Sequence, residues 1–538
     1  MNADTNADTN TDTDTDTDTD RDYDVVIVGA GPIGLLLACE LRLGGARVLV
    51  VERLAEVDET IKAGGINTLT AVALYRRGLL PALIGVQEET MTGMKEFLRA
   101  RAANDGKDAA PPPKSAGHFA GITLRADLVD GSDPAFADLG PAGDVGRFVP
   151  QAPLERLFGR RAGELGVEVR RQVELTGFDT DEEGVTVRLA PVDGSAPQAV
   201  RAGWLVGCDG GRSLVRKLAG IEFPGTAPEI TGYQAIADMT GTEGLRSGWH
   251  ATDTGMYTYG PMPGRMVSIE FDGPPSDRQS PVTAEELQAG VRRVTGVDVT
   301  VHKLHSATRF TDNCRQAATY RSGRVLLAGD AAHVHSPFGG QGLNLGVGDA
   351  MNLGWKLALV VRGRARETLL DSYTAERHPL GAWVLQWTRA QIAAMRPESH
   401  ARALREVITD LAGTADGATY FVRRISGLWQ HYDLPGGHPL TGHSAPDLAL
   451  ADGTRLADHL HTGRALLLDV ADDPKLRARA DGYEDLVDVL TTACPQRPDL
   501  AALLVRPDGT TAWAADTDDT EQDPTDALRL WFGAPLGA

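Results

Sequence analysis

Apolar positions near the start of the chain predict a strand, a buried helix and a second strand. The segments 23–28 and 47–51 are short runs rich in β-branched residues. Between them, the segment 32–43 is apolar on most faces, which is typical of a helix covered on all sides. This order predicts a β-α-β unit with parallel strands.

Helical and strand-like periodicities alternate in the next part of the chain. The segment 150–165 has apolar residues recurring on one side, as in an amphipathic helix. The segments 167–189 and 203–209 have the short apolar pattern of strands, with a turn at 182–184. Three prolines in the segment 103–114 predict a loop.

The second half of the chain changes from strands to helices and back. The segment 223–310 has mostly strand patterns, interrupted by a predicted helix at 283–294. A buried strand is predicted at 324–328, then a long helix at 343–361 and further helices to about residue 428. Beyond residue 438, strand and loop patterns alternate, which predicts a separate small α/β domain.

Length and charge limit the classes of protein to consider. The chain has 538 residues and a formal net charge of −21, and its first twenty-two residues are largely repeated Asp-Thr. Such a segment has nothing apolar to bury, so we expect a disordered acidic tail over 1–22. The acidic balance argues against a nucleic-acid partner. No apolar run is long enough to span a membrane, so we expect no membrane partner and a cytoplasmic protein.

Cysteine and histidine positions give no sign of a metal or disulfide framework. The four cysteines are far apart and form no CxxC pair, which argues against a disulfide network, a zinc site or a dithiol centre. His333 and His335 form an HxH pair without a nearby third ligand. We therefore predict no metal site.

A glycine-rich loop joins the first predicted strand to the first helix. Gly29, Gly31 and Gly34 have the spacing G-x-G-x-x-G, and Glu52 lies 23 residues after Gly29 at the end of the second strand. Glycines let the backbone approach a pyrophosphate, which the helix N-terminus attracts. An acidic residue at this distance binds a ribose hydroxyl. The loop predicts a dinucleotide site without distinguishing FAD from NAD.

A second glycine-rich segment narrows the choice between FAD and NAD. Gly329 and Asp330 end a predicted strand 300 residues after Gly29, and Gly339 and Gly340 lead into the long helix. An acidic residue can bind ribityl hydroxyls, and helix-start N–H groups can face the pyrimidine edge of a flavin. The two segments together favour FAD.

These motifs resemble those of the single-component FAD-dependent aromatic hydroxylases, the para-hydroxybenzoate and phenol hydroxylase group. The resemblance covers about 23–377 and is nearest to members that act on aromatic polyketides. It adds Asp209, in a Cys-Asp-Gly motif shared by FAD and the nicotinamide cofactor, and Gln151 and Arg53 near FAD. The residues that the motifs and the resemblance assign to the cofactor are Gly29, Gly31, Pro32, Ile33, Gly34, Glu52, Arg53, Lys62, Gln151, Asp209, Gly329, Asp330, Pro337, Gly339, Gly340, Gly342, Leu343 and Asn344.

One loop departs from the pattern of this family. Members commonly carry a Ser-Arg pair after the ribose acid, whereas this chain has Lys62 in the segment Ile61 to Gly65. Lys62 is the candidate substitute for the arginine. The departure affects flavin mobility or the nicotinamide contact.

The resemblance implies an α/β fold with three parts: a Rossmann-like FAD-binding domain, a β-sheet substrate domain and a C-terminal thioredoxin-like domain. The C-terminal part lacks the redox CxxC, so we expect a structural or dimer-supporting role, and both a monomer and a homodimer are open. The predicted boundaries are a tail over 1–22, an FAD-binding domain over 23–101, 117–222 and 311–400, a substrate domain over 223–310, a helical linker over 401–437 and a thioredoxin-like domain over 438–538.

The resemblance also implies a reaction. NADPH or NADH reduces FAD, O2 gives a flavin C4a-hydroperoxide, and one oxygen atom is inserted into a polycyclic aromatic polyketide of antibiotic-type metabolism by ring hydroxylation. No protein group is singled out as catalytic, and Arg53 and Pro337 are the candidates for a place near the flavin ring. Baeyer–Villiger insertion into a polycyclic ketone is the first alternative. A non-oxygenating flavin dehydrogenase or a flavin-binding sensor is the second.

Overall fold

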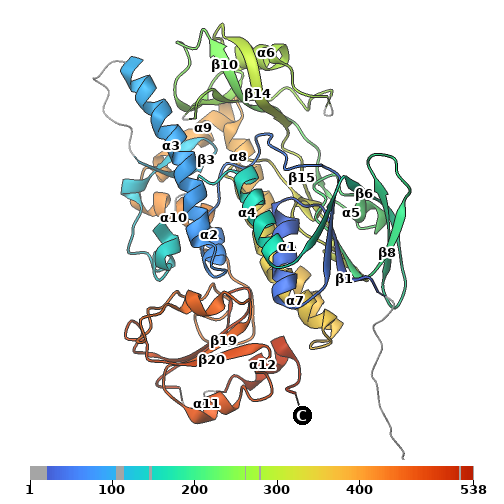
Figure 1. The fold of residues 1–538 in the computed structure, drawn as a ribbon. Helices are drawn as coiled ribbons and strands as arrows, with labels where there is room; N and C mark the ends of the chain where they lie inside the picture. Colours follow the sequence, from blue (N-terminus) through green and yellow to red (C-terminus); the bar gives the residue numbers. More distant parts are fainter. Residues whose placement is uncertain are drawn as a thin grey trace, which may run out of the picture.

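A central parallel sheet organises the first part of the computed structural model, which describes residues 21–104, 114–144, 148–260, 262–277, 280–519 and 523–536. Its strand order is β16-β17-β8-β1-β2-β5, and the hairpin β6-β7 is attached to β8 (Figure 1). β17, β8, β1, β2 and β5 pair in parallel, so their carboxyl ends share one edge. The strands are β1 (Tyr23–Val28), β2 (Val48–Glu52), β5 (Glu168–Arg171), β6 (Val173–Thr180), β7 (Val185–Pro191), β8 (Gln198–Gly207), β16 (Arg321–Ser322) and β17 (Val325–Leu327).

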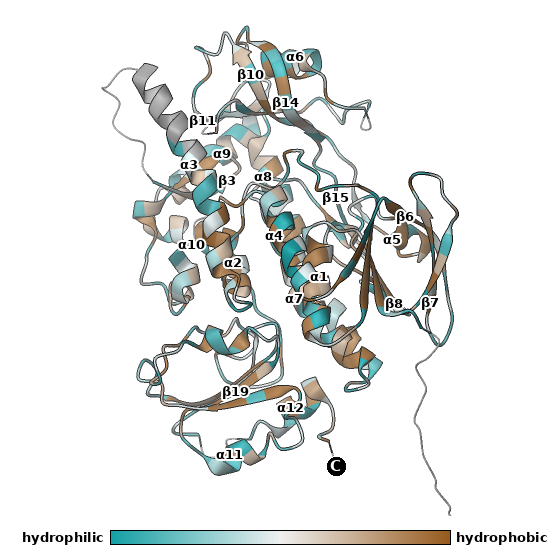
Figure 2. Cartoon of the chain, in the orientation of Figure 1, coloured by the Kyte–Doolittle hydropathy of each residue, from teal (hydrophilic) through white to brown (hydrophobic). Residues whose placement is uncertain are grey.

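Helices cover this sheet and bury its central strands. α1 (Pro32–Leu43) packs against α7 (Gln341–Val361) and α4 (Gln151–Glu164), while the short α5 (Leu214–Leu218) follows β8. The β1 and β2 runs of valine, isoleucine and leucine are buried, as expected for parallel strands covered on both faces. Figure 2 shows these strands as predominantly hydrophobic.

A second, antiparallel sheet lies above the first in Figure 1, with the order β11-β12-β13-β10-β14. Its strands are β10 (Thr231–Thr240), β11 (Gly248–Ala251), β12 (Gly255–Tyr259), β13 (Arg265–Glu270) and β14 (Thr300–Phe310). α6 (Ala284–Thr295) packs on it, capped by the Thr283 hydroxyl and ended by Gly296 at φ 69°. Smaller sheets are formed by β3 (Ser115–Phe119) with β4 (Ile122–Arg125), and by β9 (Gly225–Thr226), β15 (Cys314–Gln316) and β18 (His333–Val334).

Two further groups of helices flank the sheets. The long α8 (Asp371–Met395) packs beside α7 and leads into α9 (Ser399–Ala412) and α10 (Ala415–Ile425). The second group, α2 (Thr68–Tyr75) and α3 (Leu80–Asn104), comes earlier in the chain and follows the first β-α-β unit. The predicted loop at 103–114 lies almost wholly outside the described residues, as do the first twenty residues of the tail predicted over 1–22.

The C-terminal part has its own mixed sheet, ordered β20-β19-β21-β22. β19 (Ala465–Asp469) and β20 (Val487–Thr491) are parallel, whereas β21 (Leu500–Val505) and β22 (Thr511–Asp516) form an antiparallel hairpin. The helices α11 (Pro474–Ala478) and α12 (Thr525–Phe532) accompany the sheet. This arrangement is thioredoxin-like, and it confirms the predicted α/β fold class. The exact domain boundaries stay a prediction.

Candidate functional site

The predicted site residues follow four neighbouring parallel strands. Gly29 follows β1, Glu52 ends β2, Asp209 follows β8 and Gly329 follows β17. The order of these strands in the sheet is β17-β8-β1-β2. Ligands of open parallel sheets bind at the carboxyl ends of the strands, where the connections diverge. The fold therefore brings segments that are 300 residues apart in the sequence to one edge.

The first glycine loop is tight on one side and open on the other. Gly29 has φ +107°, and a Cβ atom there would lie 2.4 Å from the Cys208 carbonyl oxygen. A Cβ atom on Gly34 would lie 1.9 Å from the Gly29 oxygen. At Gly31, by contrast, a Cβ atom would meet no atom within 4 Å. Gly31 is the N-cap of α1 and precedes Pro32, so the helix start faces free space without a covering side chain.

Glu52 turns its carboxylate back to this loop. One oxygen accepts a hydrogen bond from the Ala30 N–H at 2.8 Å, and the other accepts one from Leu54 N–H at 2.9 Å. The carboxylate thus lies beside the N-terminus of α1, where a ribose next to a pyrophosphate would be. Arg53 is exposed at the same edge.

Asp209 has one carboxylate oxygen in use and one free within the described part of the chain. Oδ2 accepts hydrogen bonds from the N–H groups of Leu214 at 2.7 Å and Val215 at 3.1 Å, which caps α5. Oδ1 is buried and has no partner there. Since buried polar atoms are normally hydrogen-bonded, Oδ1 is suited to a ligand hydroxyl.

The second glycine segment lies against the first. A Cβ atom on Gly329 would be 3.2 Å from an Ile33 side-chain carbon. Gly339 and Gly340 have φ values of +79° and +62°, and α7 begins directly after them. Gly340 is open like Gly31, because a Cβ atom there would meet nothing within 4 Å. This second helix start therefore also offers free backbone N–H groups.

The other predicted residues of this segment have different surroundings. Pro337 is exposed, whereas Leu343 and Asn344 are buried. The Asn344 side chain is used within the protein, since its Oδ1 accepts from Asn67 N–H at 2.8 Å and its Nδ2 donates to the Gly340 oxygen at 2.7 Å. Asn344 thus fixes the turn at Gly340. Gly342 faces His335, because a Cβ atom on Gly342 would lie 3.4 Å from the His335 Nε2 atom.

Charged groups accumulate around Asp330. Desolvation raises the pKa of the Asp330 carboxyl, against the positive charges of His333 and Lys62. Desolvation also raises the pKa of Glu155 to about 7, although Lys62 and Arg171 oppose this. Lys62 pairs with Asp58 at 2.8 Å. The predicted substitute for the family arginine is therefore a cation close to the second cofactor segment.

Hydrogen bonds to the backbone of the Lys62 loop hold it between α4 and the antiparallel sheet. The N–H of Gln151, the first residue of α4, donates to the Ala63 oxygen at 2.9 Å. On the other side, Gln234 of β10 donates to the Ile61 oxygen at 2.8 Å. Gln151 thus helps to position the Lys62 loop through its backbone N–H group.

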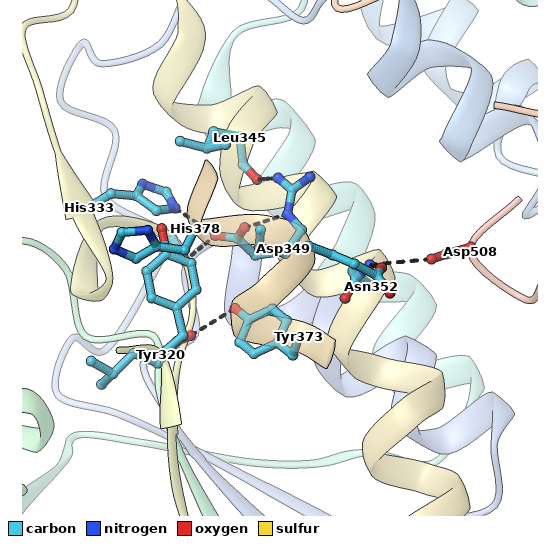
Figure 3. A network of polar contacts seen from close by, with 12 residues as sticks. Tyr320, His333, Leu345, Asp349, Asn352, Tyr373, His378 and Asp508 are labelled. Atoms are coloured by element: carbon cyan, nitrogen blue, oxygen red, sulfur yellow. Dashed lines mark hydrogen bonds and ion pairs between the residues drawn. The ribbon is translucent and has the colours of Figure 1, made fainter. Parts of the chain in front are cut away.

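His333 of the HxH pair belongs to a buried polar network. Figure 3 shows His333 and Asp349 from α7 in contact, with Nε2 donating to Oδ2 at 2.6 Å. Arg377 Nε donates to the other Asp349 oxygen at 2.9 Å. Desolvation opposes ionisation, but His333 and Arg377 hold the pKa of Asp349 below its ordinary value. Among the described residues, no group of three or more potential ligands is placed to hold a metal ion.

Aromatic rings connect the second cofactor segment to the antiparallel sheet. Phe338, next to Pro337, lies 6.1 Å from the Trp249 ring of β11 and 5.8 Å from the Phe310 ring of β14, between ring centroids. Phe119 packs edge-on against Trp387 of α8 at 4.8 Å. The loop that would meet a flavin therefore borders an apolar, aromatic region. The sequence did not indicate these contacts, because the rings come from five distant segments.

The residues present fit FAD. Two glycine-lined helix starts are open, Glu52 and Asp330 lie next to them, and the Asp209 Oδ1 atom is free to accept a hydrogen bond. A dinucleotide with a long ribityl chain needs contacts at both places, whereas NAD needs only the first kind of loop.

Comparisons with known proteins agree with this geometry. The family model of the FAD binding domain matches residues 22–388, and that of the aromatic-ring hydroxylase C-terminal region matches residues 438–535. The 12-dehydrotetracycline 5-monooxygenase/anhydrotetracycline 6-monooxygenase of Streptomyces rimosus is 40% identical, covering 95% of this chain and 99% of that protein. The rifampicin monooxygenase of Streptomyces venezuelae is 38% identical with coverages of 95% and 99%. The dialkyldecalin synthase of Streptomyces rugosporus is 38% identical with coverages of 95% and 98%.

Solved structures show the same similarity in three dimensions. OxyS anhydrotetracycline hydroxylase from Streptomyces rimosus has a TM-score of 0.80 at 40% identity, covering 95% of this chain and 99% of that chain. CabE, an aromatic hydroxylase from angucycline biosynthesis, has a TM-score of 0.81 at 34% identity with the same coverages. No helix in the described part of the chain is long and apolar enough to cross a membrane. The chain belongs to the family of FAD-binding aromatic-ring hydroxylases, and the protein is an FAD-dependent monooxygenase.

Proposed function

We propose that the protein hydroxylates the ring of a polycyclic aromatic polyketide in antibiotic-type metabolism, with NADPH or NADH as electron donor. The observation that carries this proposal is the aromatic region formed by Phe338, Trp249 and Phe310, which joins the second cofactor segment to the antiparallel sheet. Flat aromatic rings pack well against such side chains. The similarity to anhydrotetracycline and angucycline hydroxylases supports the same substrate class. Because NADPH is supplied in the cytoplasm, the proposal also places the protein there.

The protein contributes binding, orientation and exclusion of water. We propose that the open helix starts at Gly31 and Gly340 bind the pyrophosphate and the pyrimidine edge of FAD, and that Glu52 and Asp330 bind its ribose and ribityl hydroxyls. When bound, FAD supplies the redox chemistry that activates O2. The apolar walls around Phe338 exclude water from the reacting ring. Arg53 and Lys62 remain candidates for contacts with the cofactor, and Arg53 and Pro337 for a place near the flavin ring.

The test is turnover under labelled O2 with a panel of polycyclic phenols and quinones. We expect purified protein to be yellow, to oxidise NADPH faster when a substrate is present, and to give a product that is heavier by one labelled oxygen atom with all rings intact. A lactone product would instead show Baeyer–Villiger insertion into a ketone. Turnover without O2, or FAD binding without NADPH oxidation under any substrate, would contradict oxygenation.

Parallel reactions decide the electron donor and test a non-redox reaction. We expect NADPH and NADH to differ in the rate of anaerobic flavin reduction with substrate bound, which stopped-flow absorbance measures directly. The dialkyldecalin synthase among the relatives makes one further control necessary. A substrate that is converted without any change of oxidation state, and with no electron donor present, would contradict ring hydroxylation.

A further inference from the structure

Buried charges connect the C-terminal part to the helices of the FAD site. Arg506, at the end of the hairpin strand β21, is fully buried although it carries a charge. Its two terminal nitrogens lie 3.0 Å and 2.8 Å from the carboxylate oxygens of Glu376 in α8. Arg506 also pairs with Asp508 and stacks over the Trp531 ring, 4.4 Å from its centroid. The planar guanidinium thus fixes one carboxylate of α8 in direction as well as in distance.

Glu376 is shared with α7. Lys356 Nζ lies 3.0 Å from one Glu376 oxygen, and Asn352 Nδ2 donates to the other at 2.6 Å. Figure 3 shows Asn352 also reaching toward Asp508, with 3.5 Å between Nδ2 and Oδ2. One carboxylate therefore joins α7, α8 and the C-terminal part. Such a group is costly to bury unless all its partners stay in place.

The same two helices also hold the second cofactor segment, through residues that lie close to Glu376 and Asn352 in the sequence. Arg377 directly follows Glu376 in α8, and Asp349 lies one turn before Asn352 in α7. Arg377 holds one Asp349 oxygen, while the other accepts from Gly329 N–H at 3.0 Å and from His333 at 2.6 Å. Asp349 thus fixes both ends of the segment 329–333. Asp330, the predicted ribityl ligand, lies between these ends.

A parallel connection runs to the first cofactor helix. Arg77 at the end of α2 pairs with Glu40 of α1 at 2.7 Å and 2.6 Å, and donates to the oxygens of Leu460 at 2.9 Å and Pro507 at 2.6 Å in the C-terminal part. Arg77 and Glu40 are both buried. Both helices whose starts are open to FAD are therefore tied, at their far ends, to the C-terminal part.

We propose that the thioredoxin-like domain is a positioning part of the FAD site: Arg506 fixes Glu376, and through α7 and α8 the Asp349 carboxylate that holds the segment 329–333. The domain thereby acts on FAD without touching it and without thiol chemistry. Coupling between the two sites is shown by a measured effect of Arg506 on the binding of FAD. It deepens the FAD site and rests on FAD binding alone.

The experiment measures the Kd of FAD for the full-length apoprotein of Arg506→Met by quenching of flavin fluorescence, at a temperature well below the Tm. Methionine keeps the approximate volume and removes the charge, so Glu376 loses both hydrogen bonds from Arg506. We expect the Kd of FAD to rise about 10-fold or more, and Arg506→Lys, which keeps a charge without the fork, to recover part of the affinity. The absorption spectrum of bound flavin reports a displaced ring independently of affinity.

The matched control is Arg497→Met in the same domain. Arg497 pairs only with its neighbour Asp499 among the ion pairs described, at 2.8 Å, and does not reach α7 or α8. We expect it to bind FAD as the unaltered chain does. A lower Tm for Arg506→Met with an unchanged Kd of FAD would overturn the proposal, because the pair would then stabilise the domain interface alone.

A second variant keeps the proposal testable if Arg506→Met does not fold. Asp508→Asn keeps the shape of the side chain, weakens the hold on Arg506, and is read by the same Kd and spectrum with the same two outcomes. Hydroxylation is not part of the measurement. A failure of the proposed reaction therefore leaves this result unaffected, and the two failures can be told apart.

Discussion

At the scale of single residues, two glycines of one loop differ in what a methyl group would meet. Gly34→Ala would place a carbon 1.9 Å from the Gly29 backbone oxygen, whereas Gly31→Ala meets nothing within 4 Å among the described residues. Gly31 also has φ −68° and ψ 176°, which alanine adopts without strain. We therefore expect Gly34→Ala to lower the Tm of the apoprotein strongly and Gly31→Ala to leave it nearly unchanged.

For Gly31→Ala, the effect should appear only with the cofactor. A methyl group at the open helix start occupies the place of the pyrophosphate, so we expect the Kd of FAD to rise about 10-fold or more, equal to about 1.4 kcal/mol. Titration of apoprotein with FAD measures it. Unchanged affinity would show that the pyrophosphate lies elsewhere.

Glu155 gives a pH-dependent prediction. Burial raises its folded-state pKa from 4.5 to about 7. Between these values the folded protein binds a proton that the unfolded chain has released, so stability falls as pH rises and the full cost is present above pH 7. Glu155→Gln does not titrate. We expect its stabilising effect, relative to the unaltered chain, to be larger at pH 8 than at pH 5 by about 1–2 kcal/mol.

Urea unfolding of the holoprotein at pH 5 and pH 8, with saturating FAD, measures this difference. An equal effect of Glu155→Gln at both pH values would mean that the carboxyl group titrates normally. Asp127→Asn is the control, since this exposed residue pairs only with Arg125 among the ion pairs described. Its effect on stability should be small at both values.

A site residue could be predicted when its role depends on residues next to it in the sequence. Gly29, Glu52 and Gly329 were recognisable because strand, turn and helix start are contiguous in the sequence. Asp349 and Arg377 were not, because their roles follow from packing of α7 on α8. His333 was visible as half of an HxH pair, but its partner lies 16 residues later and only the fold brings it near. An aspartate in a largely apolar helix was the one available signal.

At the scale of elements, α1 and α7 are held close by glycine. A Cβ atom on Gly346 would lie 2.7 Å from Ile33 Cδ1. Gly346→Ala should therefore push the helices apart at a cost of about 1–3 kcal/mol. Because the clash is with a side chain, Ile33→Ala should relieve it, and the two changes together should cost less than their sum by about 1 kcal/mol.

Urea unfolding of both single variants and the double variant gives this coupling. Gly163→Ala in α4 is the control, since a Cβ atom there meets nothing within 4 Å. It should stabilise the protein by about 0.5–1 kcal/mol through helix propensity. Strict additivity of the Gly346 and Ile33 changes would show that the helix spacing is not set by this contact.

Elements with a clear period were predicted within a few residues, and the rest were missed for a physical reason. The helix predicted at 283–294 is α6, because Thr283 caps it and its apolar residues keep to one face. The segment 343–361 is α7, which begins two residues earlier at the glycine turn. α3 was not predicted, because its apolar residues follow no single stripe and its polar residues are many. β14 extends to Phe310 because it pairs with β10.

At the scale of the whole molecule, the fold class was predictable but the docking of its parts was not. The strand and loop pattern beyond residue 438 predicted a small α/β domain, and the family resemblance implied that it is thioredoxin-like. The sheet order β20-β19-β21-β22 has that form. Its contacts with the rest join residues such as Arg506 and Glu376, 130 positions apart. No pattern within the sequence marks such a pair, because each of the two charged residues, seen alone, looks like an ordinary surface residue.

Residues of α7 complete one hydrophobic core of the C-terminal domain. Trp355 and Leu359 of α7 are buried in one cluster with Leu467 of β19 and Trp531 of α12. The rings of Trp355 and Trp531 lie 6.3 Å apart between centroids. A domain whose core is completed by another domain cannot unfold without exposing that surface. We therefore expect one cooperative thermal transition for the holoprotein, in which far-UV circular dichroism and release of flavin coincide.

Leu467→Ala tests this cooperativity. The residue is fully buried in β19, far along the chain from the cofactor motifs, and its truncation should destabilise by about 2–4 kcal/mol. If the parts unfold together, this change lowers the temperature of flavin release as much as that of the circular dichroism signal, and added FAD raises both. Two separate transitions, with flavin release unmoved by Leu467→Ala, would show that the C-terminal domain unfolds on its own. The single transition is expected because α7 belongs to both cores: its start belongs to the segment that we propose binds FAD, and its last turns are packed inside the domain at the other end.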